Sequence, residues 1–505
     1  MKVTFAQGAD APCRARLWPV SRTAALWTAY LALAALLAAP LLLVEVPLGV
    51  DTLNHLARIH ARVHIADDPD IARLFELRDV LVPYMGLDWL LTPLARVMPT
   101  LVVGRVATVL LLWGTVGAVV ALQRAFAGRI GFEPLAMGLV SYNAVLAWGF
   151  LNYMLGVIGA LLGLAAWHAM RERPWLLRLV LFTAVATALY FTHLLALALY
   201  GVMLGAYEVF GRPGAWRTPV RDWALLGAQF LPAALLWVQL AMPPPGGETG
   251  MSWLPAAKAL ALTSPFLFSG AAGGLDPGMA VFVGCVFLLV RLTRTGALRW
   301  DRRLAAPAAV LVLMGLVVPT RAFGVFFVDM RFPVIGAYLA AAAIRAAPGA
   351  TRRWLPLVLA LTAAALVQAG SAGEAMRACD RQYGELRAAL QMVPRGATLT
   401  AVQETEAPAP GVPCTNLRVY DHMPQLITLE RSGYSPDFFA RVTAVTVRDG
   451  QPTDRDPWPA HLVTPDMLPP SGHLLWMHLG NHARPVPPGL TLLRGGSFFD
   501  LFSIP

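Results

Sequence analysis

Long apolar runs separated by short polar connections fill most of the first 371 residues, and they restrict the fold more than any other feature. Each run has 15 to 23 residues. Because the hydrocarbon core of a membrane contains no water, each run would have to satisfy its own backbone as a helix. Hydrophobic residues make up 57% of the chain and charged residues 14%, far from the soluble average. The sequence therefore predicts a mainly α, polytopic membrane protein with eleven transmembrane helices, at 24–46, 101–123, 134–149, 153–170, 176–191, 194–210, 222–242, 278–292, 304–320, 332–346 and 353–371.

Arginine is concentrated in every second connection between these runs. The connections at 149–153 and around His193 contain no Lys or Arg. Because cytoplasmic loops are enriched in these residues, the alternation predicts a cytoplasmic N-terminus in a bacterial inner membrane. The first run follows Arg14, Arg16 and Arg22 and is too long for a cleaved signal peptide, so we expect an uncleaved anchor. The arginine-rich connections carry Arg124 and Arg129; Arg171, Arg173 and Arg178; Arg212, Arg217 and Arg221; Arg291, Arg294, Arg299, Arg302 and Arg303; and Arg345, Arg352 and Arg353.

This topology leaves three substantial segments outside, 47–100, 243–277 and 372–505. The last segment begins with GEAMRACDRQYGELRAALQMVP, which has the pattern of an amphipathic helix, and continues with GATLTAV, which is typical of a strand. HLLWMHL and LTLLRGGSFFDLFSI indicate later strands. The sequence thus predicts a transmembrane domain over 1–371 and a small extracytoplasmic α/β domain over 372–505.

Two of the four cysteines, Cys379 and Cys414, fall in this C-terminal domain. An oxidising compartment would permit a bridge between them. Two free buried thiols fit equally well, because spacing alone does not fix connectivity.

The net charge of +10 could indicate a nucleic-acid surface. The basic residues lie mostly in the short connections, however, where membrane topology already accounts for them. We therefore expect membrane lipids as partners and no nucleic acid.

The first outside segment opens with DTLNHLARIHARVHIADD. If it forms a helix, with about 100° per residue, Asp51, His55, Arg58 and Arg62 lie within about 60° of one another. One interpretation makes Asp51 a helix N-cap and the stripe a solvated face. The other makes Asp51 a general base at the membrane surface, with Arg58 and Arg62 facing an anionic group such as a phosphate. The two roles are compatible.

Three histidines in the same segment raise the question of a metal site. The spacing places His60 and His64 on one helical face and His55 off it, and no cysteine joins them. The sequence therefore indicates neither a metal site nor a cofactor.

Polar residues near the outer ends of the runs are further candidates, because ionisable groups at membrane depth are costly. Asp88 lies in an apolar stretch, where it either pairs with Arg96 or belongs to the site. Asp329 and Arg331 could simply neutralise each other. The remaining candidates on outside segments are Asn54, Asn152, His193, Lys258 and Arg321.

The layout as a whole resembles the GT-C superfamily of membrane glycosyltransferases, which includes protein O-mannosyltransferases and the lipid A aminoarabinose transferase. Shared features are a cytoplasmic N-terminus, a long first outside loop opening with an acid, many spans, and an outside C-terminal domain. The local anchors are the segment from Asp51 to Arg58, GLDWLL at 86–91 and VDMRFP at 328–333.

The resemblance implies transfer of a sugar from a polyprenyl-phosphate donor to an extracytoplasmic glycan, lipid or protein. Asp51 would deprotonate the acceptor hydroxyl, with inversion at the anomeric carbon. Many members carry two adjacent acids here, whereas Thr52 follows Asp51 in this chain, so His55 or Asp88 would fill the second role. The leaving phosphate would be neutralised by Arg58, Lys258, Arg321 or Arg331.

Two other functions fit the layout. A transporter or flippase of a lipid-linked saccharide would show ionisable residues near the bilayer midplane and two related halves. Here the ionisable residues gather at the outer ends of the runs and no repeat is visible, which favours surface chemistry. A non-catalytic membrane assembly protein would keep its function without Asp51.

Overall fold

The computed structural model describes most of the chain, and all statements below refer to these residues. Cys13, Arg14, Arg16, Arg212 and Arg217 lie outside them, as does much of the segment 243–277. The described residues are 22–78, 80–211, 220–240, 250–268, 277–322, 325–347, 351–404, 414, 418–440, 443–448, 457–479 and 488–505.

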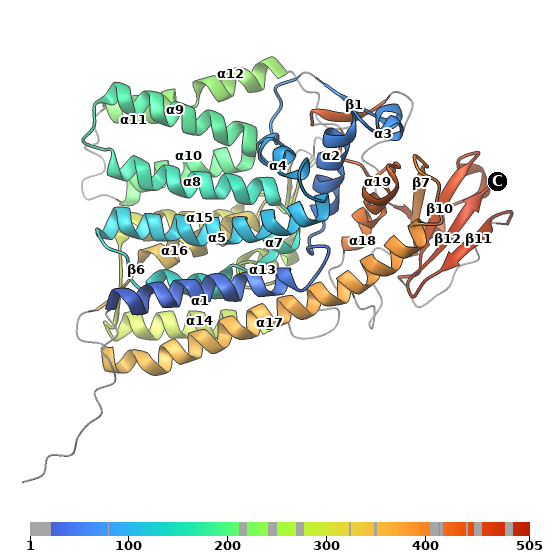
Figure 1. Ribbon diagram of the computed structural model, residues 1–505. Helices are drawn as coiled ribbons and strands as arrows, with labels where there is room; N and C mark the ends of the chain where they lie inside the picture. Colours follow the sequence, from blue (N-terminus) through green and yellow to red (C-terminus); the bar gives the residue numbers. More distant parts are fainter. Residues whose placement is uncertain are drawn as a thin grey trace, which may run out of the picture.

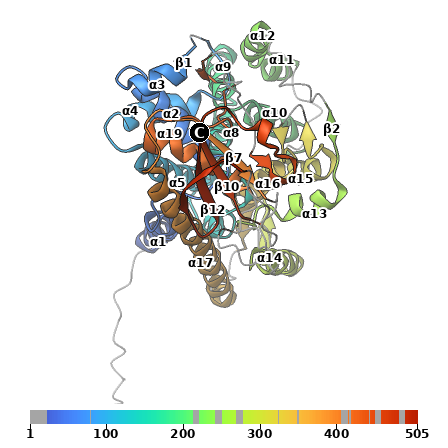
Figure 2. The ribbon, with the colours of Figure 1, turned by 90° about the vertical axis from the view of Figure 1, so that its right-hand side faces the viewer.

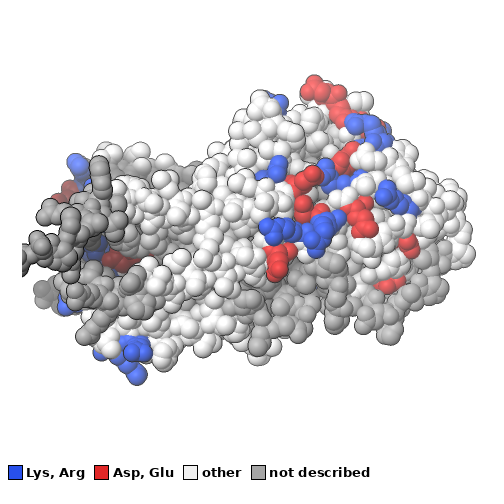
Figure 3. All heavy atoms as spheres, turned by 60° about the horizontal axis from the view of Figure 1, so that its bottom comes forward, with Lys and Arg blue, Asp and Glu red and all other residues white. Residues whose placement is uncertain are grey.

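Six helices in the described part are long and apolar enough to cross a membrane, which supports the prediction of a membrane protein. They lie side by side in a bundle (Figure 1). On the face shown in Figure 3, a wide band without charged side chains separates the charged groups at the two ends. The six are α1 (Arg22–Leu42), α5 (Thr100–Ala127), α8 (Leu151–Ala169), α9 (Trp175–Thr192), α10 (Leu194–Ala206) with its π-helical continuation η2 (Tyr207–Gly211), and α17 (Thr351–Leu390).

Two of the eleven predicted spans are interrupted. The run 134–149 consists of η1 (Glu133–Ala136), α6 (Met137–Val140) and α7 (Ala144–Ala147). The interruption arises at Asn143, whose side chain caps α7 and donates to the Val140 carbonyl and the Tyr338 hydroxyl. The run 222–242 is divided into α11 (Val220–Ala228) and α12 (Leu231–Leu240). Pieces of this length cannot cross hydrocarbon alone, so the predicted count of eleven single spans is not confirmed.

Shorter helices and two small ribbons complete the bundle. α15 packs against α16, where a Cβ on Gly336 would lie 3.1 Å from the Ala308 carbonyl oxygen. The remaining bundle elements are α13 (Pro255–Thr263), α14 (Pro277–Arg294), α15 (Arg302–Val317), α16 (Arg331–Ala343), the antiparallel pair β3 (Leu298–Trp300) and β6 (Ile344–Ala346), and the ribbon β2 (Met251–Ser252), β4 (Arg321–Ala322) and β5 (Val325–Phe326).

The C-terminal region contains a five-stranded mixed sheet in the order β11-β12-β10-β7-β9. β7 lies parallel to β10 and β9, and β12 lies antiparallel to β10 and β11. The strands predicted in GATLTAV and HLLWMHL are present, and LTLLRGGSFFDLFSI forms an antiparallel pair. The bounds are β7 (Leu399–Gln403), β9 (Trp458–Pro459), β10 (Gly472–Met477), β11 (Thr491–Gly495) and β12 (Phe499–Ile504), with α18 (Val419–His422) and α19 (Leu426–Arg431) after β7.

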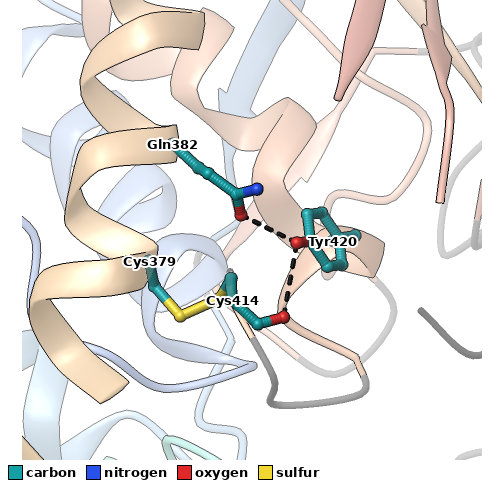
Figure 4. The surroundings of a disulfide bond; sticks show 4 residues. All are labelled: Cys379, Gln382, Cys414 and Tyr420. Carbon is teal, nitrogen blue, oxygen red and sulfur yellow. Dashed lines mark hydrogen bonds between the residues drawn. A yellow bond between two sulfur atoms is a disulfide. The ribbon is translucent and has the colours of Figure 1, made fainter. Parts of the chain in front are cut away.

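Helix α17 joins the bundle to this sheet without a break. It runs as one helix through the predicted boundary at 371/372, so the last predicted span and the amphipathic helix after it are continuous (Figure 1). Cys379 of α17 forms a disulfide with Cys414, which settles the alternative that the sequence left open. Figure 4 shows this bridge beside Gln382 and Tyr420.

The first outside segment packs against the C-terminal region. It contains α2 (Thr52–His64), α3 (Pro69–Leu74), β1 (Phe75–Leu77) and α4 (Gly86–Ala95). β1 pairs antiparallel with β8 (Val445–Val447), and Phe75 packs against Tyr434 and Phe438. These two parts of the chain thus form one layer over one end of the bundle (Figures 1 and 2).

Candidate functional site

Asp51 lies directly before α2, and hydrogen bonds from α17 and from the end of the run 134–149 hold the backbone of its segment. The Asp380 carboxylate of α17 accepts from the Val46 amide at 2.8 Å. The amides of Val50 and Asp51 donate to the carbonyls of Ala147 and Trp148, at 3.2 and 3.0 Å. Asp51 occupies the N-cap position of α2 without a side-chain capping bond, so the capping role is not observed. Its side chain keeps 21% of its surface exposed.

Two glycines allow the segment before Asp51 to pack closely against the end of the run 134–149. A Cβ on Gly49 would lie 2.8 Å from the Gly149 Cα, and a Cβ on Gly149 would lie 2.8 Å from the Thr52 amide nitrogen and 3.0 Å from that of Asp51. Gly149 also has φ +72°, a conformation that favours glycine. The end of the interrupted run 134–149 therefore contacts the backbone of Asp51 directly and holds it in place.

We expect Gly149→Ala to destabilise the protein more than Gly128→Ala. Both positions have φ near +70°, so both variants incur a similar strain of about 1–2 kcal/mol. A Cβ at Gly128 meets no atom within 4 Å, whereas at Gly149 it displaces the backbone of Asp51 and Thr52. Chemical unfolding of the purified variants measures the difference. Equal losses would mean that the close approach at Gly149 relaxes without cost.

His422 of α18 faces Asp51 from the C-terminal region. Its Nε2 lies 3.6 Å from Asp51 Oδ1, and its Nδ1 lies 3.5 Å from Asp437 Oδ2. Burial lowers the pKa of His422, but the interactions with Asp437, Asp51 and Asp421 outweigh burial and raise the pKa to about 9. These three carboxylates therefore favour the cationic form of the imidazole.

Asn54 connects α2 to the same cluster. Its amide donates to the Asp437 carbonyl at 3.0 Å and accepts from the Phe439 amide at 3.0 Å. Its Nδ2 also lies 2.9 Å from His422 Nδ1. A neutral ring would accept this hydrogen bond, and a protonated ring would instead donate to Asp437.

Arg58 and Asp88 form a buried ion pair beside this cluster. Two hydrogen bonds of 2.7 Å join them in bidentate geometry, and each side chain is 2% exposed. The partner of Asp88 is thus Arg58 rather than Arg96. His55 Nδ1 lies 3.1 Å from Arg58 Nη2. Burial, together with the charges of Arg58 and His422, holds the pKa of His55 well below its usual value, so this ring is neutral.

Arg331 is a buried guanidinium at the start of α16, 4% exposed. It lies over the rings of Phe150 at 3.8 Å and Tyr153 at 5.3 Å, and its Nη1 is 3.5 Å from His193 Nε2. Among the described residues no carboxylate lies within ion-pair distance of Arg331, and its Nε has no hydrogen-bond partner. Asp51 is the carboxylate whose charge acts on it.

The alternative in which Asp329 and Arg331 neutralise each other is not observed. Asp329 instead accepts from Lys258 at 2.7 Å and from the Thr320 hydroxyl at 2.8 Å. Lys258 also donates to the Val318 carbonyl. This pair holds α13 against the segment before α16 and satisfies both charges.

The other predicted residues take structural positions around the site. Asn152 bonds the Leu87 amide at 3.1 Å and the Tyr84 carbonyl at 3.0 Å, which fixes the start of α4. His193 caps α10 through the Leu195 amide. Arg321 lies 4.3 Å over the Phe326 ring, and Arg62 is half-buried on α2.

An apolar groove runs along the bundle surface next to the site. It has a volume of about 670 Å³ and lies between Trp89 of α4 and one face of α9. At its outer end α4 touches α9, since a Cβ on Gly86 would lie 3.1 Å from the Thr192 Cα. His193 follows Thr192 directly and contacts Arg331. The residues of α9 that line the groove are Leu179, Val180, Thr183, Ala184, Thr187, Ala188 and Phe191.

Metal binding finds no support in this arrangement. The described part of the chain holds no group of three or more His, Cys, Asp or Glu side chains placed to bind a metal ion. The rings of His60 and His64 lie 4.4 Å apart at a tilt of 48°, and His60 contacts the Thr100 hydroxyl.

Sequence reasoning placed Asp51 and Asn54 in the site but missed His422 and Asp437. The sequence offered little to identify His422, which follows Asp421 in the segment VYDHMPQ. In the structure this segment is buried throughout. Its distance of 368 residues from Asn54 hid the contact.

These features define a helical membrane protein with a partly open carboxylate, a cationic imidazole and a buried guanidinium at one end of its bundle. Neither a scan against protein-family models nor a search of curated proteins finds a match.

Proposed function

We propose that this protein is a membrane glycosyltransferase that moves a sugar from a polyprenyl-phosphate donor to an acceptor hydroxyl. The observation that carries the proposal is that two groups lie at this end of the bundle: Asp51, partly exposed and without a side-chain capping bond to its own helix, and Arg331, a buried cation with no carboxylate within ion-pair distance among the described residues. A base and an anion-binding group at the same membrane boundary are what this reaction needs.

In the proposed step, Asp51 accepts the proton of the acceptor hydroxyl while that oxygen attacks the anomeric carbon. The bond between this carbon and the phosphate oxygen breaks, and its electron pair leaves with the phosphate. Arg331 offsets the negative charge that develops there. Attack opposite to the leaving phosphate inverts the anomeric configuration.

The apolar groove supports a lipid-linked donor. Its walls are almost entirely hydrocarbon, and its lining ends at Phe191, two residues before His193, which contacts Arg331. A polyprenyl chain lying along α9 would bring its phosphate to the end where the buried guanidinium lies.

We further propose that this end of the bundle faces the extracytoplasmic side of a bacterial inner membrane. The β3–β6 ribbon, which carries Arg299 and Arg345, lies at the end away from the C-terminal sheet (Figure 1). Cytoplasmic ends attract arginine, and the Cys379–Cys414 disulfide suits an oxidising compartment.

A direct test supplies the purified protein in nanodiscs with radiolabelled polyprenyl-phosphate sugars and cell-envelope extract as acceptor. We expect label in a new product, with the anomeric configuration inverted when read by NMR. Movement of the donor between leaflets of vesicles without any product would instead identify a flippase.

We expect Arg331→Ala to weaken binding of a polyprenyl-phosphate sugar by about tenfold or more, since hydrogen bonds to charged groups contribute about 1.5–3 kcal/mol. Binding of the acceptor should change little. Titration of the donor into nanodiscs measures the effect, and Arg299→Ala, at the opposite end of the bundle, is the control. Unchanged donor affinity would remove Arg331 from the phosphate site.

A further inference from the structure

Building on the proposed function, we propose that His422 is a positioning residue: the C-terminal region holds this imidazole against Asp51 and thereby keeps the carboxylate ionised and oriented. The site is then assembled from two parts of the chain, and the bundle alone does not complete it.

The contacts of the ring support this role. His422 has its two nitrogens near two different carboxylates, Asp51 and Asp437, and its ring stands edge-on to Phe439 at 4.8 Å. Asp437 is itself held by Gln425, which donates to Oδ1 at 2.8 Å. The ring is 8% exposed, so little water competes for either nitrogen.

Helix α17 fixes the position of α18. The Tyr420 hydroxyl donates to Gln382 Oε1 at 2.7 Å and contacts the Cys414 carbonyl at 3.3 Å (Figure 4). The disulfide ties Cys414 to Cys379, one turn before Gln382 on α17. Because α17 also holds the segment before Asp51 through Asp380, the same helix positions both partners.

The charges around the contact favour a cationic ring. Burial lowers the pKa of His422, but Asp437, Asp51 and Asp421 face the ring and raise its pKa above the usual value. A cation near a carboxylate stabilises the ionised form. The charge of Asp51 also acts on Arg331.

The effect of His422 on position 51 can be measured without any substrate, through the reactivity of a cysteine introduced there. In full-length protein in nanodiscs, Cys13→Ser and Cys285→Ser remove the other cysteines outside the disulfide pair, and Asp51→Cys introduces one reactive thiol. Its rate of alkylation by iodoacetamide is followed from about pH 5 to pH 10, because the thiolate is the nucleophile. We expect His422→Gln to move the midpoint of this profile up by about one pH unit.

His478→Gln is the matched control, because it removes a histidine of the same region that pairs with Glu404 and Asp500 instead. It should leave the midpoint unchanged. His422→Asn gives a second variant in case His422→Gln does not fold. An unchanged midpoint in the folded His422 variant, or an equal shift in the control, overturns the inference. A shifted midpoint together with full sugar transfer by Asp51→Asn would support the contact and refute the proposed base.

Discussion

Replacing Asp51 with Asn is expected to lower the rate of sugar transfer by a factor on the order of a hundred or more, the usual contribution of a general base. The amide cannot accept the acceptor proton, although it has nearly the same shape. Because Asp51 makes no capping bond to α2, helix stability should change little. Turnover of a radiolabelled donor by purified protein measures the first effect, and thermal unfolding the second.

Asp67→Asn is the control for this experiment, since it changes an exposed carboxylate on the same outside segment. It should retain full activity. If Asp51→Asn turned over donor as fast as the control, the assigned role of Asp51 would be refuted. A non-catalytic assembly protein would then be the better interpretation.

Breaking the Arg58–Asp88 pair should have the largest effect on stability. Both side chains are 2% exposed and joined by two hydrogen bonds. Removing one partner of such a pair leaves a buried charge and costs about 3–5 kcal/mol. We therefore expect Arg58→Ala to lower the free energy of unfolding by this amount, measured by denaturant titration of the purified protein.

Two comparisons make this result specific. Arg129→Ala removes a partly exposed cation from Glu133, which it contacts at 3.0 Å, and should cost less than about 1 kcal/mol. The double change Arg58→Met and Asp88→Leu should lose less than Arg58→Ala, because neither charge is left buried. If Arg58→Ala cost no more than Arg129→Ala, the pair would not be the anchor that joins α2 to α4.

The sequence was most informative where hydrophobicity alone decides the outcome. The runs that became α1, α5 and α8 are visible in the sequence as long and mostly apolar stretches. The run 134–149 looked similar, yet Asn143 interrupts it by bonding Tyr338, which is 195 residues away. A hydropathy pattern carries no information about such a partner.

For the site, the sequence located polar groups but not their pairing. For Asp88 and Asp329 the sequence offered pairing with Arg96 and Arg331, each the nearest cation along the chain, as the alternative to a role in the site. The structure pairs Asp88 with Arg58 and Asp329 with Lys258. This leaves Arg331 without an ion-pair partner among the described residues, which is the property that makes it a candidate for anion binding.

Three features were determined by the sequence alone: the membrane-protein character, the position of the charged segments, and the place of Asp51 shortly after the first apolar run. All three follow from composition and local order. Only the tertiary structure decided which charges meet. Asp51 and His422 are adjacent because α17 carries the C-terminal region back over α2. Long-range electrostatic contacts of this kind depend on packing rather than on spacing along the chain.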